Sequence, residues 1–590
     1  MTYDRRRFIG SVGACALQAD RAFAQSLPNL AVTIEYHGKE YSYTLQAGVD
    51  LGSFQSPIGG FVQGCWAAQR PDFPLVVHFR PDLDGERTEI VFEFGRLWGA
   101  DPQHLEAYVA KIYRDSTVLA TIQIPKHFWF SRWRWQSMPR PVVGDVSQLI
   151  KSHLLPPFGL SQHSISATNV QAPAASRKSQ SASTAGGLPA APQLTDAGKL
   201  LFGNPAPTER GKSLGIGASP QRTAAPKNEK RNANRFKYEI MGSAGLELYM
   251  PGTGERDDIG MVTGWQAQYI VSQAPADRDV IIAQAEAAGT IPWHMRDLET
   301  GAPIDLDVYS QATWYPDVAP SKNKIKTLAS DFKVDSSHQP AVAYLPYLLT
   351  GDPYYLEELQ FAANWNRGSL VPEYRLSIPQ SRSFAWSLRT LSQAANVSPA
   401  EPPRWLLPKK YWVDLLERTR IWFQGEFVES DYPPRKIFRA LRDPRGYDGI
   451  TKPWQEDFVS SVMGWVILMG FESWLPQFKW QIDTQIARTS NKRGWPRAYA
   501  TPYDLSLSPP GKVEWVSSWA DAWSLNAEIY NYQVPTSDDW LVSEDKNYLQ
   551  YTRGALVFID MIGVEDVTDA LAWSRGQLTN NWTVTPKWRL

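Results

Sequence analysis

The second half of the chain repeats one helical pattern. Beyond residue 236, apolar residues recur at helical spacing, and the segments come in pairs joined by tight turns marked by Gly or Pro. At three turns Gly351, Gly470 or Gly563 stands where a helix needs a left-handed stop, and an acidic or Ser residue able to cap the next helix follows. We predict eleven helices, near residues 258–273, 276–289, 339–349, 354–367, 381–395, 409–427, 455–470, 474–489, 514–530, 545–562 and 565–577.

Helical hairpins that repeat in this way either stack into an open solenoid or close into a ring. Three inserts between the predicted helices are long and aromatic, at 292–334, 431–454 and 495–513. Long ordered loops in a compact domain are usually functional, and a ring would gather them at one end. We therefore predict that residues 238–590 form a closed (α/α)6 toroid.

The first part of the chain has a different pattern. Short segments rich in β-branched and aromatic residues lie at 31–36, 40–45, 75–79 and 88–94, and each has the length of a strand. The segments at 108–113 and 118–124 flank Arg114-Asp115-Ser116, which suits a hairpin with a short polar turn. Residues 26–158 are therefore predicted to form a β-sandwich or barrel-like domain, and the fold class is multi-domain α+β.

A segment of low complexity separates these two parts. Between roughly residues 160 and 235 the composition shifts to Ser, Ala, Pro, Gln, Lys and Asn, with Phe202 as the single aromatic residue. Such a segment buries too little apolar area to offset the entropy of ordering it. We predict a disordered linker at 159–237. Its basic end, 227–235, would suit an anionic surface, although its composition favours a solvated tether.

The N-terminus resembles an export signal. A basic region that ends in Phe8 precedes a short apolar stretch at 9–17 and the small residues before Gln25. The Arg pair followed by Phe resembles a twin-arginine signal, which implies export of a folded protein, although Asp20 and Arg21 depart from that pattern. We predict a signal peptide at 1–25 and a bacterial periplasmic or secreted location. The alternative is a disordered cytosolic N-terminus.

Charge and cysteine content exclude several classes of protein. A net charge of -1 provides no excess of positive charge with which to bind nucleic acid. A content of 43% hydrophobic residues argues against general disorder. Loss of Cys15 with the signal would leave Cys65 alone, so packing must stabilise the fold without a disulfide. No P-loop, dinucleotide fingerprint or zinc-spaced Cys cluster occurs, and no later stretch reaches the ~18 apolar residues of a membrane span. We expect no cofactor, no nucleic acid partner and no membrane span.

Three motifs in the helical half resemble a known group of enzymes. They are Asp257-Asp258-Ile259-Gly260 with Trp265-Gln266, Ser337-His338-Gln339-Pro340, and Arg382-Ser383-Phe384-Ala385-Trp386 with Leu388-Arg389. The region from 240 to 580 resembles the (α/α) toroid domains of polysaccharide lyases and glycoside hydrolases. A β-rich domain ahead of such a toroid is similar to the architecture of some exo-acting rhamnogalacturonan lyases. The resemblance implies a carbohydrate-active enzyme with a polysaccharide or oligosaccharide substrate.

Aromatic residues are abundant in the loops between the predicted helices, and the chain has 25 Trp in all. Flat aromatic side chains cover the apolar faces of sugar rings while a polar edge hydrogen-bonds the hydroxyls. The alternative for any single Trp is that it packs helix pairs together. The predicted substrate-binding residues are Asp257, Trp265, Trp293, Tyr344, Trp386, Trp454, Glu456 and Trp519.

Only two of the eight histidines, His294 and His338, fall in the helical half. His338 stands at a predicted helix start, where the helix dipole disfavours the protonated ring and favours a neutral base. A lyase removes the proton next to a uronate carboxylate, which requires such a base and cations that stabilise the enolate. The alternative is a histidine satisfied by backbone partners. The predicted catalytic residues are His294, His338, Arg296, Asp297, Tyr347 and Arg382, with Tyr344 as the alternative to Tyr347.

Carboxylates offer a competing interpretation. A glycoside hydrolase needs two carboxyl groups about 5–10 Å apart across the scissile bond. The candidates are Asp257, Asp258, Asp297, Glu456 and Asp457, although the pairs at 257–258 and 456–457 also suit helix N-termini. A third interpretation is a non-catalytic glycan-binding or cell-envelope scaffold protein, because a fold does not fix a function.

Calcium is the one metal for which the sequence offers ligands. Asp305 and Asp307 with Asp317 would supply the hard oxygen atoms that calcium prefers. We do not include a metal in the predicted site.

Overall fold

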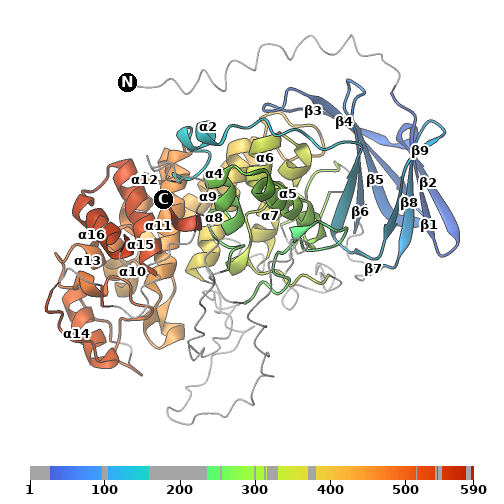
Figure 1. The fold of residues 1–590 in the computed structure, drawn as a ribbon. Coiled ribbons are helices and arrows are strands. Elements are labelled where there is room, and N and C mark those ends of the chain that lie inside the picture. Colours follow the sequence, from blue (N-terminus) through green and yellow to red (C-terminus); the bar gives the residue numbers. More distant parts are fainter. Residues whose placement is uncertain are drawn as a thin grey trace, which may run out of the picture.

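The computed structural model places an N-terminal β-sheet region against a helical C-terminal part (Figure 1). The predicted signal peptide, the predicted linker up to residue 235 and Asp317 lie outside the described residues. The structure describes residues 27–95, 104–158, 236–252, 256–297, 300–310, 312, 314, 330–369, 380–512, 514–537, 541–542, 548–579 and 586–590. Within these ranges, no helix combines the length and apolar character that crossing a bilayer requires.

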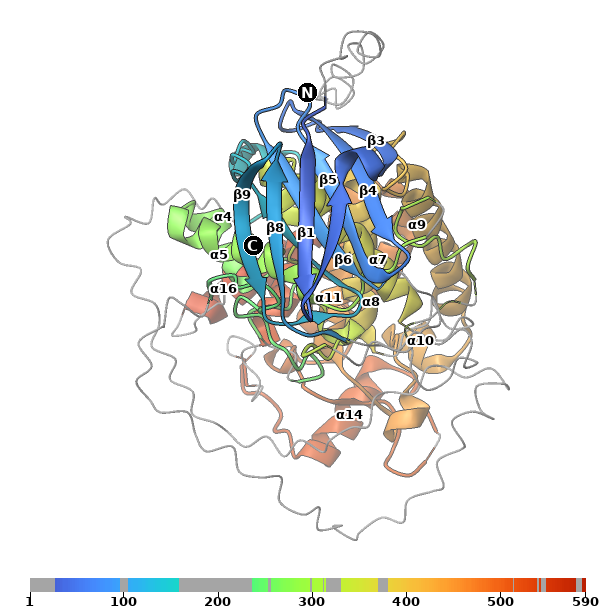
Figure 2. The same ribbon diagram turned by 90° about the vertical axis from the view of Figure 1, so that its right-hand side faces the viewer.

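Two antiparallel sheets build the β-rich part, and Figure 2 shows the smaller one in front of the helices. The four-stranded sheet has the order β2-β1-β8-β9 and the five-stranded sheet the order β11-β6-β5-β4-β3. The strands are β1 (Leu30–Tyr36), β2 (Lys39–Thr44), β3 (Val49–Gln55), β4 (Val62–Arg70), β5 (Phe73–Pro81), β6 (Thr88–Phe94), β8 (Tyr108–Arg114), β9 (Thr117–Ile124) and β11 (Ser131–Gln136), with β7 (His104–Leu105) and β10 (His127–Phe128) as a separate pair.

All six predicted strands are present, and the β8–β9 hairpin is confirmed by the pairing of Arg114 with Thr117. Three long strands were not predicted. Gly52 interrupts β3, Gly64 interrupts β4, and β11 alternates Trp with charged or polar residues. Glycine and charge are both depleted in strands, and this weakens the sequence signal.

The two sheets face each other across one apolar core. Val32 and Ile112 of the four-stranded sheet meet Phe79 and Phe92 of the five-stranded sheet. Trp133 stacks on Phe92 with a centroid distance of 4.0 Å and an interplanar angle of 6°. Side chains alternate between the two faces of a strand, so the residues on either side of Trp133 point away from this core.

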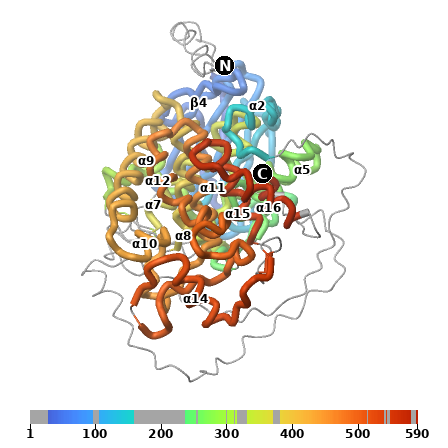
Figure 3. The backbone as a smooth tube through the Cα atoms, turned by 90° about the vertical axis from the view of Figure 1, so that its left-hand side faces the viewer, coloured from blue at the N-terminus to red at the C-terminus, as the bar shows by residue number. Residues whose placement is uncertain are grey.

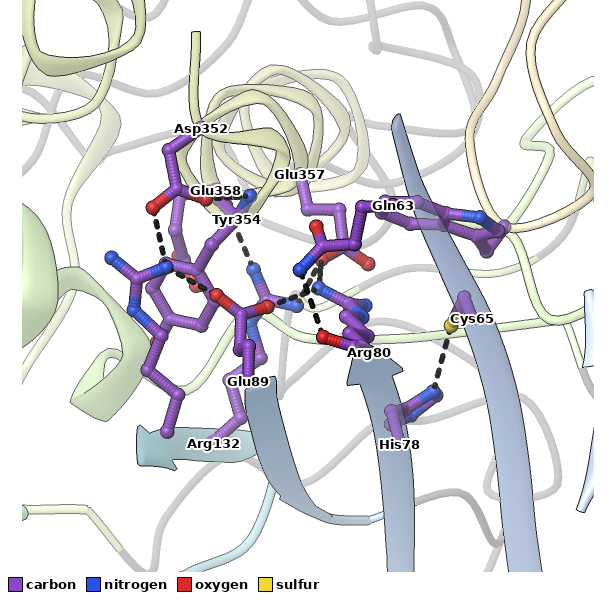
Figure 4. A network of polar contacts seen from close by, with 12 residues as sticks. Gln63, Cys65, His78, Arg80, Glu89, Arg132, Asp352, Tyr354, Glu357 and Glu358 are labelled. Atoms are coloured by element: carbon purple, nitrogen blue, oxygen red, sulfur yellow. Dashed lines mark hydrogen bonds and ion pairs between the residues drawn. The ribbon is translucent and has the colours of Figure 1, made fainter. Parts of the chain in front are cut away.

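The opposite face of the five-stranded sheet carries charge, and it is buried under helices α5 (Pro275–Ala287) and α7 (Pro353–Gly368). Figure 4 shows Arg80 and Arg132 from the sheet close to Glu357 and Glu358 of α7. None of the residues in this interface network is more than 9% exposed. The network consists of Arg80, Arg132, Arg134, Arg296 and His294 with Glu89, Glu93, Glu286, Asp352, Glu357 and Glu358.

Each of the eleven predicted helical segments contains a helix, and Figure 3 shows several of them packed together. The predicted stops at Gly351 and Gly563 are confirmed, with φ of 65° and 69°. The segment at 474–489 is divided into two helices, and α2 (Val146–Lys151) and α10 (Pro433–Phe438) were not predicted. The remaining helices are α4 (Gly264–Ser272), α6 (Tyr344–Thr350), α8 (Ser381–Val397), α9 (Lys409–Phe423), α11 (Pro453–Leu468), α12 (Leu475–Gln481), α13 (Asp483–Thr489), α14 (Trp519–Tyr530), α15 (Leu549–Ile562) and α16 (Thr568–Thr579).

Helices α8, α11 and α15 lie side by side, and aromatic side chains fill the space among them. Phe458 of α11 is the centre of this group. Its ring centroid lies 5.1 Å from Trp386, 4.8 Å from Tyr551 and 5.4 Å from Trp588 near the C-terminus. The space among these three helices is therefore packed with side chains.

Candidate functional site

The starts of α8, α11 and α15 meet the short 3-10 helix η6 (Ser336–His338) at one end of the helical part. Arg382 at the start of α8 lies over Trp454 at the start of α11, with 5.8 Å from the guanidinium carbon to the ring centroid. Trp454 in turn stacks on Tyr548, which precedes α15, at 5.3 Å. We call Arg256, Asp335, His338, Arg382, Arg442, Trp454, Tyr503 and Tyr548 the His338 cluster.

His338 has the orientation of a base held by a carboxylate. Its Nδ1 lies 3.1 Å from Asp335 Oδ2, and an ionised carboxylate only accepts hydrogen bonds, so Nδ1 donates. Burial raises the pKa of Asp335, but the hydrogen bonds from His338 and Ser337 N, together with the charges of His338 and Arg382, outweigh burial, and the net pKa is lowered. The Nε2 atom of His338 is buried and has no hydrogen-bond partner in the described parts of the chain. None of the described residues therefore engages its lone pair.

The surroundings of His338 favour the neutral ring. Burial lowers the pKa of His338, the hydrogen bond to Asp335 raises it, and the positive charge of Arg382 lowers it; the net pKa is below the ordinary value of 6.5. The predicted helix start at His338 is wrong, because His338 is the last residue of η6 and α6 begins at Tyr344. The lowered pKa therefore comes mainly from burial and not from a helix dipole. A neutral histidine with a free Nε2 accepts a proton from a bound substrate near neutral pH.

Arg382 is a cation without a counter-ion at bonding distance. Its Nε donates to Gln380 Oε1 at 2.9 Å, and no carboxylate in the described ranges lies within 4.0 Å of its guanidinium nitrogens. Burial lowers the pKa of Arg382, and Asp335 opposes that change. An incompletely compensated arginine beside a base is suited to bind an anion.

Two further arginines add to this positive charge. Arg256 pairs with Asp258 at 3.1 Å, and its charge also acts on Arg382 and His338. Burial, together with the nearby Arg382, lowers the pKa of Arg442 to about 10. Arg442 also has no ion pair with any described carboxylate. The cluster therefore holds more positive than negative charge around one base.

A fourth cation, Arg389, lies beside the cluster. Arg389 on α8 is fully buried, and it donates to Gly260 O at 2.5 Å and to Gln339 O at 3.0 Å. Burial alone lowers its pKa to about 9. Because Gln339 directly follows His338, Arg389 ties the backbone that carries the base to the segment that follows Arg256.

The aromatic members of the cluster form a wall beside Arg382. Trp454 is 5% exposed and lies between Tyr503, at 5.9 Å, and Tyr548. Tyr503 is 42% exposed, and Lys452 lies 4.3 Å from the centre of its ring. Of the predicted sugar-binding aromatic residues, Trp454 is the one that the structure brings to His338 and Arg382.

His294 and Arg296 lie in the interface network and share no partner with His338. His294 Nδ1 donates to Phe130 O at 2.9 Å, and Nε2 lies 2.8 Å from a carboxylate oxygen of Glu358. Both nitrogens thus face acceptors inside the protein, and neither faces a substrate. Arg296 is occupied by Glu93 and Glu357. The alternative of a structurally satisfied histidine fits His294, whose partners include side chains as well as backbone.

Other predicted catalytic residues also lie apart from the cluster. Asp297 accepts from Thr300 N and from the hydroxyl of Tyr309, close to the β-rich part. Tyr347 is 1% exposed, and burial raises its pKa above the range in which a tyrosine serves as a base near neutral pH.

Most of the predicted aromatic contacts pack the fold. Tyr344 and Trp293 line a closed cavity of about 10 Å³, and burial also raises the pKa of Tyr344 well above its usual range. Trp386 is 1% exposed in the helical core, and Trp519 packs edge-on against Phe438. Trp265 is half-buried, with Phe236 5.7 Å away, and Asp257 is exposed before α4. The packing alternative fits these aromatic residues.

The carboxylates Glu456 and Asp457 lie inside the helical packing. Glu456 accepts from Ser381 Oγ at 2.9 Å, Leu441 N at 3.2 Å and Gln481 Nε2 at 3.2 Å. Asp457 accepts from Thr552 Oγ1 at 2.6 Å. Asp457 also pairs with the buried guanidinium of Arg488, so both carboxylates are occupied by protein donors.

We expect Glu456→Gln to stabilise the protein at alkaline pH. Burial raises the pKa of Glu456 to about 8, whereas the unfolded chain titrates near 4.5, so the wild type loses stability as pH rises through that window. The amide carries no charge, and the gain in unfolding free energy at pH 8 is about 2–5 kcal/mol. Urea unfolding at pH 5 and pH 8 measures it, with the exposed Glu429→Gln as control. Equal gains at both pH values would contradict the assignment.

The calcium interpretation finds no support among the described residues. Asp307 forms ion pairs with Arg367 and Arg418, and Asp305 Oδ1 accepts from Asp307 N and Val308 N. Within the same residues, no group of three or more His, Cys, Asp or Glu is arranged to hold a metal ion.

Sequence reasoning missed several members of the His338 cluster. Asp335 precedes His338 by three residues, and its side chain also caps η6 through Ser337 N. An acidic residue just before a helical His is a local signal that was available. Arg256, Arg442, Tyr503 and Tyr548 lie in separate loops, and only the fold brings them together.

Comparison of the chain with protein family models, with curated proteins and with solved structures found no match. The geometry of the His338 cluster is therefore the basis for any assignment of function.

Proposed function

We propose that the protein cleaves an acidic polysaccharide by β-elimination next to a uronate, with His338 as the base. The observation that carries the proposal is the buried, unpartnered Nε2 of His338 beside Arg382, with Asp335 bonded to the opposite nitrogen. A neutral base next to uncompensated cations is what removal of a proton beside a carboxylate requires.

The cluster supplies a group for each step of this reaction. Arg382 and Arg256 attract the uronate carboxylate and stabilise the negative charge that develops on it. His338 Nε2 takes the proton from the adjacent carbon, a carbon–carbon double bond forms, and the bond to the leaving sugar oxygen breaks. The imidazolium then returns the proton to that oxygen. Tyr503 is exposed beside Trp454 and offers a flat surface for a neighbouring sugar ring.

A lyase is favoured over a hydrolase by the positions of the carboxylates. Glu456 and Asp457 are occupied by helix packing, and the cluster itself contributes Asp335, which already holds His338. The pair of facing carboxyl groups that a hydrolase needs is not found among these residues. The closed (α/α)6 toroid stays a prediction, supported by the side-by-side packing of α8, α11 and α15. Export stays a prediction from the N-terminal residues.

Incubation with polygalacturonate, alginate and rhamnogalacturonan tests the proposal. A lyase creates an unsaturated product that absorbs in the ultraviolet, and we expect such absorbance to rise with at least one of these polymers. A hydrolase yields reducing ends without the absorbance, and a binding protein yields neither. Either of these two outcomes with all three polymers would overturn the proposal.

A further inference from the structure

The β-rich part carries a groove that the proposed reaction does not use. It lies against β3, β4 and the turn between β5 and β6, with a volume of about 390 Å³. This is within the size range of sites for small molecules. None of the residues that line the groove is basic. Its surface combines one large aromatic side chain with glycines and carboxylates.

Trp66 lines this groove, and its ring lies against Gly64. A Cβ atom on Gly64 would lie 2.3 Å from the six-membered ring of Trp66, so the indole rests directly on that glycine. A Cβ atom on Gly48 would also be crowded by Trp66, at 3.0 Å. The six-membered ring therefore packs against the backbone of Gly64, while Trp66 as a whole is half-buried and lines the groove. A larger residue at position 64 would prevent this position of the ring.

Two polar side chains of β3 lie on the same face of the sheet as Trp66. Asp50 on β3 pairs with Trp66 on β4, and Ser53 pairs with Gly64, so all four residues belong to the same face. A bulge between Asp50 and Ser53 inserts one extra residue and keeps both side chains on that face. Asp50 and Ser53 are exposed. Asp50 Oδ1 accepts from Gly52 N at 2.8 Å, which leaves Oδ2 for a ligand.

The remaining carboxylate in the groove is neutralised. Asp82 accepts from Arg140 through both oxygens, at 2.6 and 2.8 Å. The charge left in the groove is therefore that of Asp50. An acidic sugar would be repelled there, because no lining cation could pair with its carboxylate.

We infer that this groove binds a neutral pyranose unit of a polysaccharide. The exposed face of Trp66 covers the apolar face of the sugar ring, and Asp50 and Ser53 hydrogen-bond its hydroxyls. The inference rests on the proposed function for the class of ligand, and it does not require the reaction at His338. It gives the β-rich part a function of its own, which is to hold a neutral portion of the polymer.

Titration calorimetry on the full chain carrying His338→Asn tests this inference without turnover. The probes are β-1,4-linked hexasaccharides of glucose, mannose and galactose. We expect saturable binding of at least one probe, and a loss of affinity of about tenfold or more in Trp66→Ala. Because Trp66 also packs on the core, the exposed Asp50→Asn serves as a second variant that leaves packing intact, and it should weaken binding as well.

Tyr503→Ala separates the two sites. It alters the His338 cluster and should leave binding of the neutral hexasaccharide unchanged. Binding that is weakened by Tyr503→Ala and not by Trp66→Ala or Asp50→Asn would overturn the inference, as would the failure of all three probes to bind. Ultraviolet-absorbing product from uronate polymers reports on the proposed lyase separately, because it requires His338 and not Trp66.

Discussion

Glu357→Gln is expected to lower the free energy of unfolding by about 3–5 kcal/mol, the cost of breaking a buried ion pair. Glu357 is fully buried, and its carboxylate accepts from Arg80 at 2.6 Å, Arg132 at 2.8 Å and Arg296 at 2.5 Å. The substitution preserves the shape of the side chain, removes its charge and leaves three buried cations without that partner. Urea unfolding followed by tryptophan fluorescence at pH 7 measures the loss.

The surface pair of Glu417 with Arg420 provides a matched control. Glu417 is 43% exposed, so Glu417→Gln should change stability by less than about 1 kcal/mol. Acid dependence adds a second test. Burial raises the pKa of Glu357, but the nearby arginines outweigh burial and hold the pKa well below 4.5. The stability that the ionised carboxylate contributes is therefore fully present above pH 4.5 and is lost as the pH falls through the pKa of the folded state. Equal losses in the two variants would contradict a stabilising interface network.

His338→Asn is expected to reduce turnover of a uronate polymer by at least about a hundredfold, which is the lower range for loss of a general base. The asparagine amide takes the position of Nδ1 and still donates to Asp335, whereas the free Nε2 is lost. Unfolding curves should therefore match those of the wild type. His37→Asn, at an exposed histidine, should leave turnover unchanged. Full activity in His338→Asn would remove His338 from the mechanism.

The pH profile gives an independent readout of this base. Because the pKa of His338 is lowered, kcat/KM should rise with pH along a limb whose midpoint lies below 6.5. The positive charge of Arg382 contributes to that lowering, so Arg382→Met should move the midpoint to higher pH as well as weaken substrate binding. A midpoint that stays in place would show that Arg382 does not act on His338.

Periodicity was sufficient to predict most of the helices, because amphipathic spacing and glycine stops are local properties of the chain. The short helices α2 and α10 were missed. Arg382 and Trp454 lie in the first turns of α8 and α11, whereas His338, predicted at a helix start, is the last residue of η6. Periodicity could not foresee the role of His294. That side chain is held by Phe130, 164 residues earlier in the sequence, and by Glu358, 64 residues later.

The alternation of Trp133 with Arg132 and Arg134 is typical of a strand with one face in solvent. Here the charged face is covered by α7, because carboxylates on that helix match the arginines of the sheet. A sequence pattern shows that one face of a strand is polar, but it does not show whether water or an oppositely charged protein surface covers that face.

The interface network also holds the β-rich part and the helical part together. Arg80, Arg132 and Arg134 reach partners more than 150 residues away, on the far side of the stretch between Phe158 and Phe236. These ion pairs would therefore hold the two parts together even if the chain were cut in that stretch. A protein nicked there by a protease would migrate as two fragments in denaturing gels yet elute as one particle under native conditions.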